Sequence, residues 1–304
     1  MLPRDSRAYK TLQRSPWQPV ASTFDTYLTA PFDALRAHAG DDTRIEVEDR
    51  RVAAAHPLVS SVPLTVHQAP RSLFRAIATA GWELDVAFHY DARSVRFASL
   101  DLAGELMFAD GFRISCWVPE HRVALEHGAL ENVLRIATAY RALLAGGLVV
   151  HSASVIDHGK AALFVGRSGA GKSTLSRRAR GQGLVVPSDD LNILLPAKSG
   201  GFEVTRSSFG GDAGPDLSAP ERTPLTLVAF LEKAPKDERR AVGPASAIAR
   251  LLACCPFVGT DPHRADTLLT RCEAVLAATP CVEQWFEREG SWTQLAKPAD
   301  EDGA

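Results

Sequence analysis

One stretch near the middle of the 304-residue chain carries residues that could bind a phosphate group. It follows the pattern Gly-x-x-x-x-Gly-Lys-Ser, in which the glycines let the backbone curl so that successive N–H groups point inward. Lys172 could reach the β- and γ-phosphates of a nucleotide, and the hydroxyl of Ser173 could contact Mg²⁺. The residues expected to line this phosphate site are Gly166, Arg167, Ser168, Gly169, Ala170, Gly171, Lys172, Ser173 and Thr174.

After this motif and one expected helix, the pattern predicts a short apolar strand over 183–190 that ends in two carboxylates, Asp189 and Asp190. Ligands of open α/β sheets bind beyond the carboxyl ends of the strands, so we expect the pair to face the phosphate site. The alternative is a solvated turn. Because successive side chains of a strand alternate, only one of the two can point along the phosphate axis.

The flanking pattern predicts the elements that would position these groups. The uncharged run 161–165 predicts a buried strand leading into the glycine motif, and 172–180 predicts a helix whose N-terminus would face the anion. The run 148–156 predicts a second strand, joined to the first by a tight turn over 157–160. His151 lies on this second strand, where it is either a hydrogen-bonded core histidine or part of the site.

The composition is typical of a globular protein, with 45% hydrophobic residues, 23% charged residues and a formal net charge of −2. This near-neutral balance gives no electrostatic argument for nucleic acid as a partner. The chain has no apolar run of membrane-spanning length and no signal-peptide core at its start, so we expect a cytoplasmic protein without a membrane partner. The five cysteines form no Cys-x-x-Cys pair, which favours buried free thiols over a zinc site or a disulfide framework.

We expect two domains, with the boundary at Gly146–Gly147 after a helix over 130–145. The first domain, residues 1–146, has no cluster of acids, bases or nucleophiles, so we expect it to recognise an acceptor or to pack against the second domain. Its alternating pattern predicts an antiparallel sheet with one covered face and a helix that could cover it. The expected strands are 44–48, 64–67, 82–90, 94–100 and 112–118, and the expected helix is 70–80.

The second domain is expected over 147–295, followed by a polar tail over 296–304. Its highly charged segment 233–240 is most simply a solvated loop. Beyond the Asp pair, the pattern predicts strands at 202–206, 225–231 and 282–286 and helices at 244–254 and 263–278.

The combination of His151, the glycine motif and Ser188-Asp189-Asp190 resembles the HPr kinase/phosphorylase family and, more distantly, the PEP carboxykinases. It looks closest to the HPr-kinase-like proteins associated with peptide modification, including kinases of lasso peptides. The resemblance covers about residues 147–290 and is strongest over 148–192. It implies an α/β P-loop kinase domain of the HPr kinase/PEP carboxykinase type, here preceded by a β-rich α+β N-terminal domain.

The resemblance also implies roles for individual residues. Asp190 would be the base that takes the proton of the acceptor serine, with His151 beside it. Lys172 and Ser173 would hold the phosphates and the metal, and Asp189 would help to place the metal. The family's glutamate–arginine signature has only a faint counterpart at Glu203-Val-Thr-Arg206, so the roles of Glu203, Arg206, Arg239 and Arg240 and any phosphorylase activity stay open.

The expected function is therefore ATP- and Mg²⁺-dependent transfer of a phosphoryl group to a hydroxyl, most simply the serine of a peptide or protein. One alternative is a small-molecule kinase of the same fold. The other is a nucleotide-binding regulatory protein without turnover, against which the retention of both Lys172 and Asp190 argues. True HPr kinases are hexamers, so a homo-oligomer is also open.

Overall fold

The structure is a computed structural model of the chain, and it describes residues 57–60, 62, 64–69, 72, 87–99, 102–109, 111–119, 127–211 and 214–287. The chain divides into two compact units. Unit 1 comprises Met1–Ala53 and Val59–Ala137, and unit 2 comprises Ala54–Leu58 and Thr138–Ala304. The division falls inside helix α6 (His127–Leu144), shortly before Gly146 and Gly147. The strand expected over 44–48, nearly all of the helix expected over 70–80, and the polar tail lie outside the described residues.

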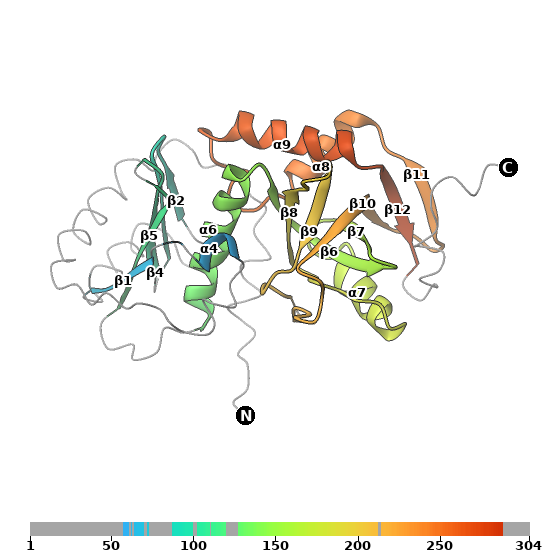
Figure 1. The fold of residues 1–304 in the computed structure, drawn as a ribbon, viewed down its shortest axis with the longest axis horizontal. Helices are drawn as coiled ribbons and strands as arrows, with labels where there is room; N and C mark the ends of the chain where they lie inside the picture. The colour runs from blue at the N-terminus through green and yellow to red at the C-terminus, as the bar shows by residue number, and fades with distance from the viewer. Residues whose placement is uncertain are drawn as a thin grey trace, which may run out of the picture. The chain divides into compact units, whose positions relative to one another are not determined.

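Unit 1 contains a five-stranded sheet in the order β1-β5-β4-β3-β2 (Figure 1). Its strands are β1 (Leu64–Ala69), β2 (Ala87–Tyr90), β3 (Ser94–Ser99), β4 (Leu102–Met107) and β5 (Arg113–Pro119), preceded by the short helix α4 (Pro57–Ser60). The pairings among β2, β3, β4 and β5 are antiparallel, whereas β1 and β5 are parallel. The prediction of a wholly antiparallel sheet is therefore wrong, because a period of two indicates which face is buried but not the direction of the partner strand.

Unit 2 is built on a seven-stranded mixed sheet in the order β11-β12-β10-β7-β6-β8-β9. Strand β9 also pairs with the first residues of β10, so β10, β7, β6, β8 and β9 close into a ring. The strands are β6 (Leu148–Asp157), β7 (Lys160–Val165), β8 (Leu191–Pro196), β9 (Phe202–Thr205), β10 (Arg222–Lys233), β11 (Glu238–Ala241) and β12 (Cys281–Phe286).

The strand that leads into the glycine motif is β7, and it has two different neighbours. On one side β6 pairs with it antiparallel, through the tight turn that the sequence predicts. His158 and Gly159 at this turn have φ values of 45° and 74°, which match the right-handed twist of a hairpin. On the other side β10 pairs with β7 in parallel, and β12 pairs in parallel with β10.

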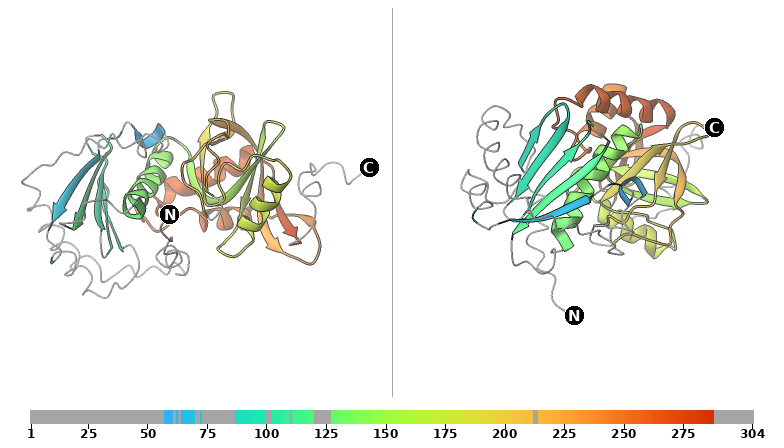
Figure 2. Two further views of the ribbon diagram at one scale, coloured as in Figure 1. Left: turned by 90° about the horizontal axis from the view of Figure 1, so that it is seen from below. Right: turned by 60° about the vertical axis from the view of Figure 1, so that its left-hand side comes forward.

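Three helices complete unit 2: α7 (Lys172–Gly181), α8 (Pro244–Leu252) and α9 (Ala265–Ala278). In Figures 1 and 2, α8 and α9 lie along one side of the unit and α7 along the other. Leu175 and Ala179 of α7 recur at helical spacing and are fully buried, which places the helix against the sheet. The core they join is formed by Ala153, Val155, Phe164, Leu175, Ala179, Val186, Ala229, Leu231, Val282 and Phe286.

The structure corrects two sequence predictions in unit 2. Residues 183–190 do not form the expected strand: Val185 makes an isolated bridge with Ile156, and the next strand, β8, begins only at Leu191. Pro187 has no N–H to donate, which interrupts a ladder at this point. The Asp pair therefore precedes a strand instead of ending one. The charged segment 233–240 is also not wholly a loop, because residues from Glu238 onward form β11 and pair with β12.

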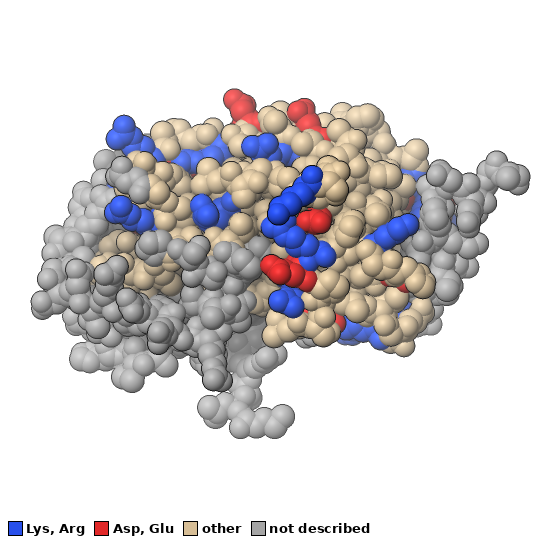
Figure 3. All heavy atoms as spheres, in the orientation of Figure 1, with Lys and Arg blue, Asp and Glu red and all other residues tan. Residues whose placement is uncertain are grey.

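The surface of unit 2 carries charges of both signs, and the cysteines are free thiols. On the face of unit 2 drawn in Figure 3, basic side chains lie beside acidic ones, and Arg250 pairs with both Glu232 and Glu283. All five cysteines are free, and four of them are buried. None of the helices in the described part of the chain combines the length and the apolar character that crossing a membrane requires.

Candidate functional site

The glycine motif forms the loop between the end of β7 and the start of α7. Gly171 has a φ of 105°, and a Cβ on it would lie 2.1 Å from Cζ of Phe286, so both conformation and space require glycine there. Gly169, at the exposed turn of the loop, has a φ of 81°. The N-cap residue of α7 is Gly171, which has no side chain to cap the helix, and the first turn contains no acidic residue. The N–H groups at this helix end are therefore available to an anion.

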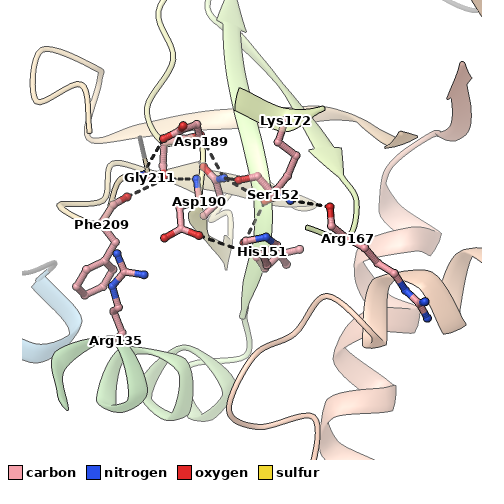
Figure 4. Close-up of polar contacts among 12 residues, drawn as sticks. Arg135, His151, Ser152, Arg167, Lys172, Asp189, Asp190, Phe209 and Gly211 are labelled. Carbon is pink, nitrogen blue, oxygen red and sulfur yellow. Dashed lines mark hydrogen bonds and ion pairs between the residues drawn. The ribbon is translucent and has the colours of Figure 1, made fainter. Parts of the chain in front are cut away.

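Lys172 points back into this loop. Its Nζ donates hydrogen bonds to the carbonyl oxygens of Gly166 at 2.8 Å and of Arg167 at 3.1 Å (Figure 4). Burial lowers the pKa of Lys172 below its ordinary value, while the charges of Cys254, Asp190 and Asp189 act in the opposite direction. The lysine is thus a partly desolvated cation that interacts electrostatically with the Asp pair, although many residues separate them in the chain.

Asp190 pairs with the histidine of the neighbouring strand. His151 Nδ1 lies 3.1 Å from Asp190 Oδ1, and the two side chains face each other in Figure 4. The His151 side chain is 26% exposed and the Asp190 side chain 9% exposed, so the pair lies at the edge of the solvent. The backbone N–H of His151 donates to the carbonyl of Cys254 at 2.7 Å, and this bond holds the His151 backbone in place. The structure therefore joins the two residues that the sequence suggests as a proton-handling pair.

Asp189 has a different environment from its neighbour. Its Oδ1 accepts a hydrogen bond from the N–H of Gly211 at 2.8 Å, and the residue is only 3% exposed. Its Oδ2 is also buried and has no hydrogen-bond partner within the part of the chain that the structure describes. A buried carboxylate oxygen without a donor is costly, and a cation would compensate it.

The segment that carries both aspartates is irregular, and β6 holds it from one side. The N–H groups of Ser152 and Ser154 donate to the carbonyls of Asp190 and Ser188, each at 2.9 Å. Asn192, fully buried on β8, donates to the carbonyl and to Oγ of Ser152 at 2.7 and 3.0 Å, and Ser154 Oγ donates to its Oδ1 at 2.5 Å. This buried polar network connects the Asp-bearing segment to the strand beside the P-loop strand.

A second loop holds the same segment from the other side. Ser188 Oγ donates to the carbonyl of Phe209 at 2.7 Å and accepts from the N–H of Asp190 at 3.1 Å. The sequence pattern gives no role to Asn192, Gly211 or Cys254, and it includes Ser188 only as the residue before the Asp pair in the motif. The one available signal is Ser188 directly before the Asp pair, since serines favour local bonds to the backbone.

The structure places the four residues of open role in other contacts. Glu203 pairs with Arg222 across β9 and β10, and Arg206 donates to the carbonyls of Leu217 and Ala219. On β11, Arg239 donates to Gln284, and Arg240 pairs with Glu238 and lies over the Trp285 ring. None of these contacts involves the phosphate loop, and each gives its residue a structural role.

The arrangement fits a divalent cation that arrives with a nucleotide. The described residues contain no group of three or more His, Cys, Asp or Glu that could hold an ion without further ligands. Mg²⁺ is commonly held by one or two carboxylates together with substrate phosphates and water. Asp189 offers one unpartnered oxygen, and Ser173, the second residue of α7, offers a hydroxyl at the phosphate loop.

Comparison with protein families found a similarity over part of the chain. Residues 126–260 are similar to the family described as SynChlorMet cassette protein ScmC. This region contains β6, the phosphate loop, α7 and the segment that carries the Asp pair. A comparison with curated protein sequences found no match.

Proposed function

We propose that this protein is a kinase that uses ATP and Mg²⁺ to phosphorylate a hydroxyl, in the simplest case a serine of a peptide or protein. The observation that carries the proposal is the meeting of two features in unit 2. A glycine loop with a buried lysine lies at an uncapped helix end, and a His–Asp pair interacts electrostatically with that lysine. Phosphoryl transfer needs these two functions, because the phosphates must be held in line and the attacking hydroxyl must lose its proton.

The roles follow from the surroundings of each side chain. The loop N–H groups and Lys172 would hold the β- and γ-phosphates, with Lys172 exchanging the carbonyls of Gly166 and Arg167 for phosphate oxygens. Ser173 and Asp189 would hold Mg²⁺, which neutralises charge on the phosphates. These interactions fix the donor side of the reaction.

Asp190 would accept the proton of the attacking hydroxyl. Its Oδ1 lies 3.1 Å from His151 Nδ1, and this contact orients the carboxylate. A positioned base of this kind typically contributes about 10²–10⁴-fold to the rate. A protein that only bound nucleotide would have no use for this pair beside its phosphate loop, which favours the kinase over the regulatory alternative.

The test compares nucleotide affinity with phosphoryl transfer in the purified full chain. γ-labelled ATP is offered with a degenerate library of serine-containing peptides, and separately with small polyols to detect a small-molecule kinase. Lys172→Ala should weaken nucleotide binding because it removes the cation from the loop. Asp190→Asn should keep affinity within about threefold of wild type while transfer falls by about 10²–10⁴-fold.

Asp157→Asn is the matched control, since Asp157 lies on the same unit at the half-buried end of β6, beside the hairpin turn. It should change neither quantity. Transfer by Asp190→Asn within a few-fold of wild type would place the base elsewhere, with Asp189 the first residue to examine. Wild-type protein that binds Mg·ATP but labels neither class of acceptor would favour the regulatory alternative.

A further inference from the structure

We propose that Gly211 is a positioning residue that makes Asp189 a one-oxygen ligand of the metal, and that the site therefore prefers Mg²⁺ and Mn²⁺ to Ca²⁺. This inference rests on the proposed function, and it concerns a residue that lies more than twenty positions beyond the Asp pair in the sequence. The two oxygens of the Asp189 carboxylate have different surroundings. Oδ1 accepts the Gly211 N–H, whereas Oδ2 is buried and has no hydrogen-bond partner among the described residues.

The space around Gly211 is tight on the side of Asp189. A Cβ on Gly211 would lie 3.0 Å from Oδ1, 3.1 Å from Oδ2 and 3.2 Å from Cγ of Asp189, all closer than ordinary van der Waals contact. Gly211 does not have the positive φ that would by itself demand glycine, unlike Gly214 in the same loop. Alanine at 211 therefore avoids the strain of a positive φ, and its nearest contacts would be with the Asp189 carboxylate.

Described residues on both sides of Gly211 bond to the Asp-bearing segment. Before it, Ser188 Oγ donates to the carbonyl of Phe209 at 2.7 Å. Beyond it, the N–H of Asp216 donates to the carbonyl of Pro187 at 3.2 Å. The bond at Phe209 lies two residues before Gly211 and helps to place its N–H, which in turn positions Oδ1 of Asp189.

A carboxylate with one oxygen already engaged in this way approaches a cation through the other oxygen. Mg²⁺ requires near-octahedral geometry and usually takes few protein ligands, whereas Ca²⁺ accepts larger coordination numbers and often binds both oxygens of a carboxylate. Bidentate binding at Asp189 would require Oδ1 to bind the cation while it also accepts the Gly211 N–H, whereas Oδ2 has all of its lone-pair sites available among the described residues. The geometry thus selects the smaller cation.

The experiment measures binding of a fluorescent ATP analogue to the full chain with Mg²⁺, with Ca²⁺ and with EDTA. Wild type should bind at least tenfold more tightly with Mg²⁺ than with Ca²⁺. Gly211→Ala should raise the Mg²⁺ concentration for half-maximal binding by about tenfold, while its affinity in EDTA stays at the wild-type value. Gly243→Ala is the matched control, because a Cβ there meets open space and its φ is −69°.

The outcomes separate the two proposals. If wild type shows no metal-dependent nucleotide binding, the proposed function itself fails. If it does, but Gly211→Ala has the same Mg²⁺ dependence as wild type, or Ca²⁺ supports binding as well as Mg²⁺, the positioning role of Gly211 is refuted. Should Gly211→Ala fail to fold, the comparison of Mg²⁺ with Ca²⁺ in wild type still decides the question.

Discussion

Replacement of Asn192 by leucine tests whether the buried polar network holds the site together. Asn192 is fully buried on β8, and its side chain makes three hydrogen bonds of 3.0 Å or less with Ser152 and Ser154 of β6. Leucine has a similar volume but can make none of them. The substitution therefore leaves polar groups of β6 facing an apolar side chain.

The expected cost can be worked out group by group. Ser154 Oγ loses the acceptor of its hydrogen bond, and the carbonyl of Ser152 loses the donor from Asn192, whereas Ser152 Oγ keeps its bond to the carbonyl of Val150. Each buried group without a partner costs about 1–3 kcal/mol, and the leucine offsets part of this by its apolar surface. The net loss should be about 2–4 kcal/mol, which for a unit of this size lowers the melting temperature by roughly 4–16 °C.

Thermal unfolding of the full chain, followed by a signal from unit 2, measures this loss. Ser218→Ala is a suitable control, because that hydroxyl also makes a short bond, 2.6 Å to Asp216, but in an exposed place, and its loss should cost little. The double variant Asn192→Leu/Ser154→Ala should recover about 1–2 kcal/mol, since it removes the orphaned hydroxyl. A stability of Asn192→Leu within 1 kcal/mol of wild type, or strict additivity in the double variant, would refute the reasoning.

Two further predictions concern the phosphate loop. Burial lowers the pKa of Lys172 in the folded chain below the ordinary value of 10.5 that it has in the unfolded chain. Between the folded and the unfolded pKa the unfolded chain binds more protons, so the free energy of unfolding rises with pH there. Phosphates favour the charged amine, so binding of Mg·ATP in this alkaline window should take up protons, as calorimetry in buffers of different ionisation enthalpy would show. Lys172→Arg should abolish the uptake; an unchanged uptake would contradict the assignment. Gly171→Ala should lower the free energy of unfolding by about 2–5 kcal/mol, because alanine disfavours a φ of 105° and its Cβ would clash with Phe286. The same substitution should weaken ATP binding. A wild-type stability together with a wild-type ATP affinity would contradict this prediction.

The local elements of the candidate site could be predicted from the sequence. The uncharged run of β7, the hairpin turn before it and the helix from Lys172 are each determined by short-range patterns, and the structure has all three. The helices α8 and α9 and the strands β9, β10 and β12 also lie where the pattern predicts them. In each case the hydrophobic period or a turn residue acts within a few positions of the element.

The long-range features could not be predicted in the same way. The segment 183–190 is apolar enough to suggest a strand, but Pro187 and the hydrogen bonds of Ser188 give it an irregular path. The approach of Gly211 to Asp189 depends on the closure of a distant loop, and no short-range pattern encodes it. The parallel pairing of β1 with β5 has the same origin, because the partner of a strand is chosen by the tertiary structure.

Strand β6 connects the two halves of the candidate site. Along one edge it pairs with β7, which ends at the phosphate loop, and along the other it pairs with β8 and donates N–H groups to the carbonyls of Ser188 and Asp190. It also carries His151 itself. The relative position of Lys172 and Asp190 is therefore set by backbone hydrogen bonds across a single strand, which resist displacement more than contacts between loops do. We therefore expect Asn192→Leu, which removes hydrogen bonds to Ser152 and Ser154 of β6, to disturb the positions of both the phosphate loop and the Asp pair.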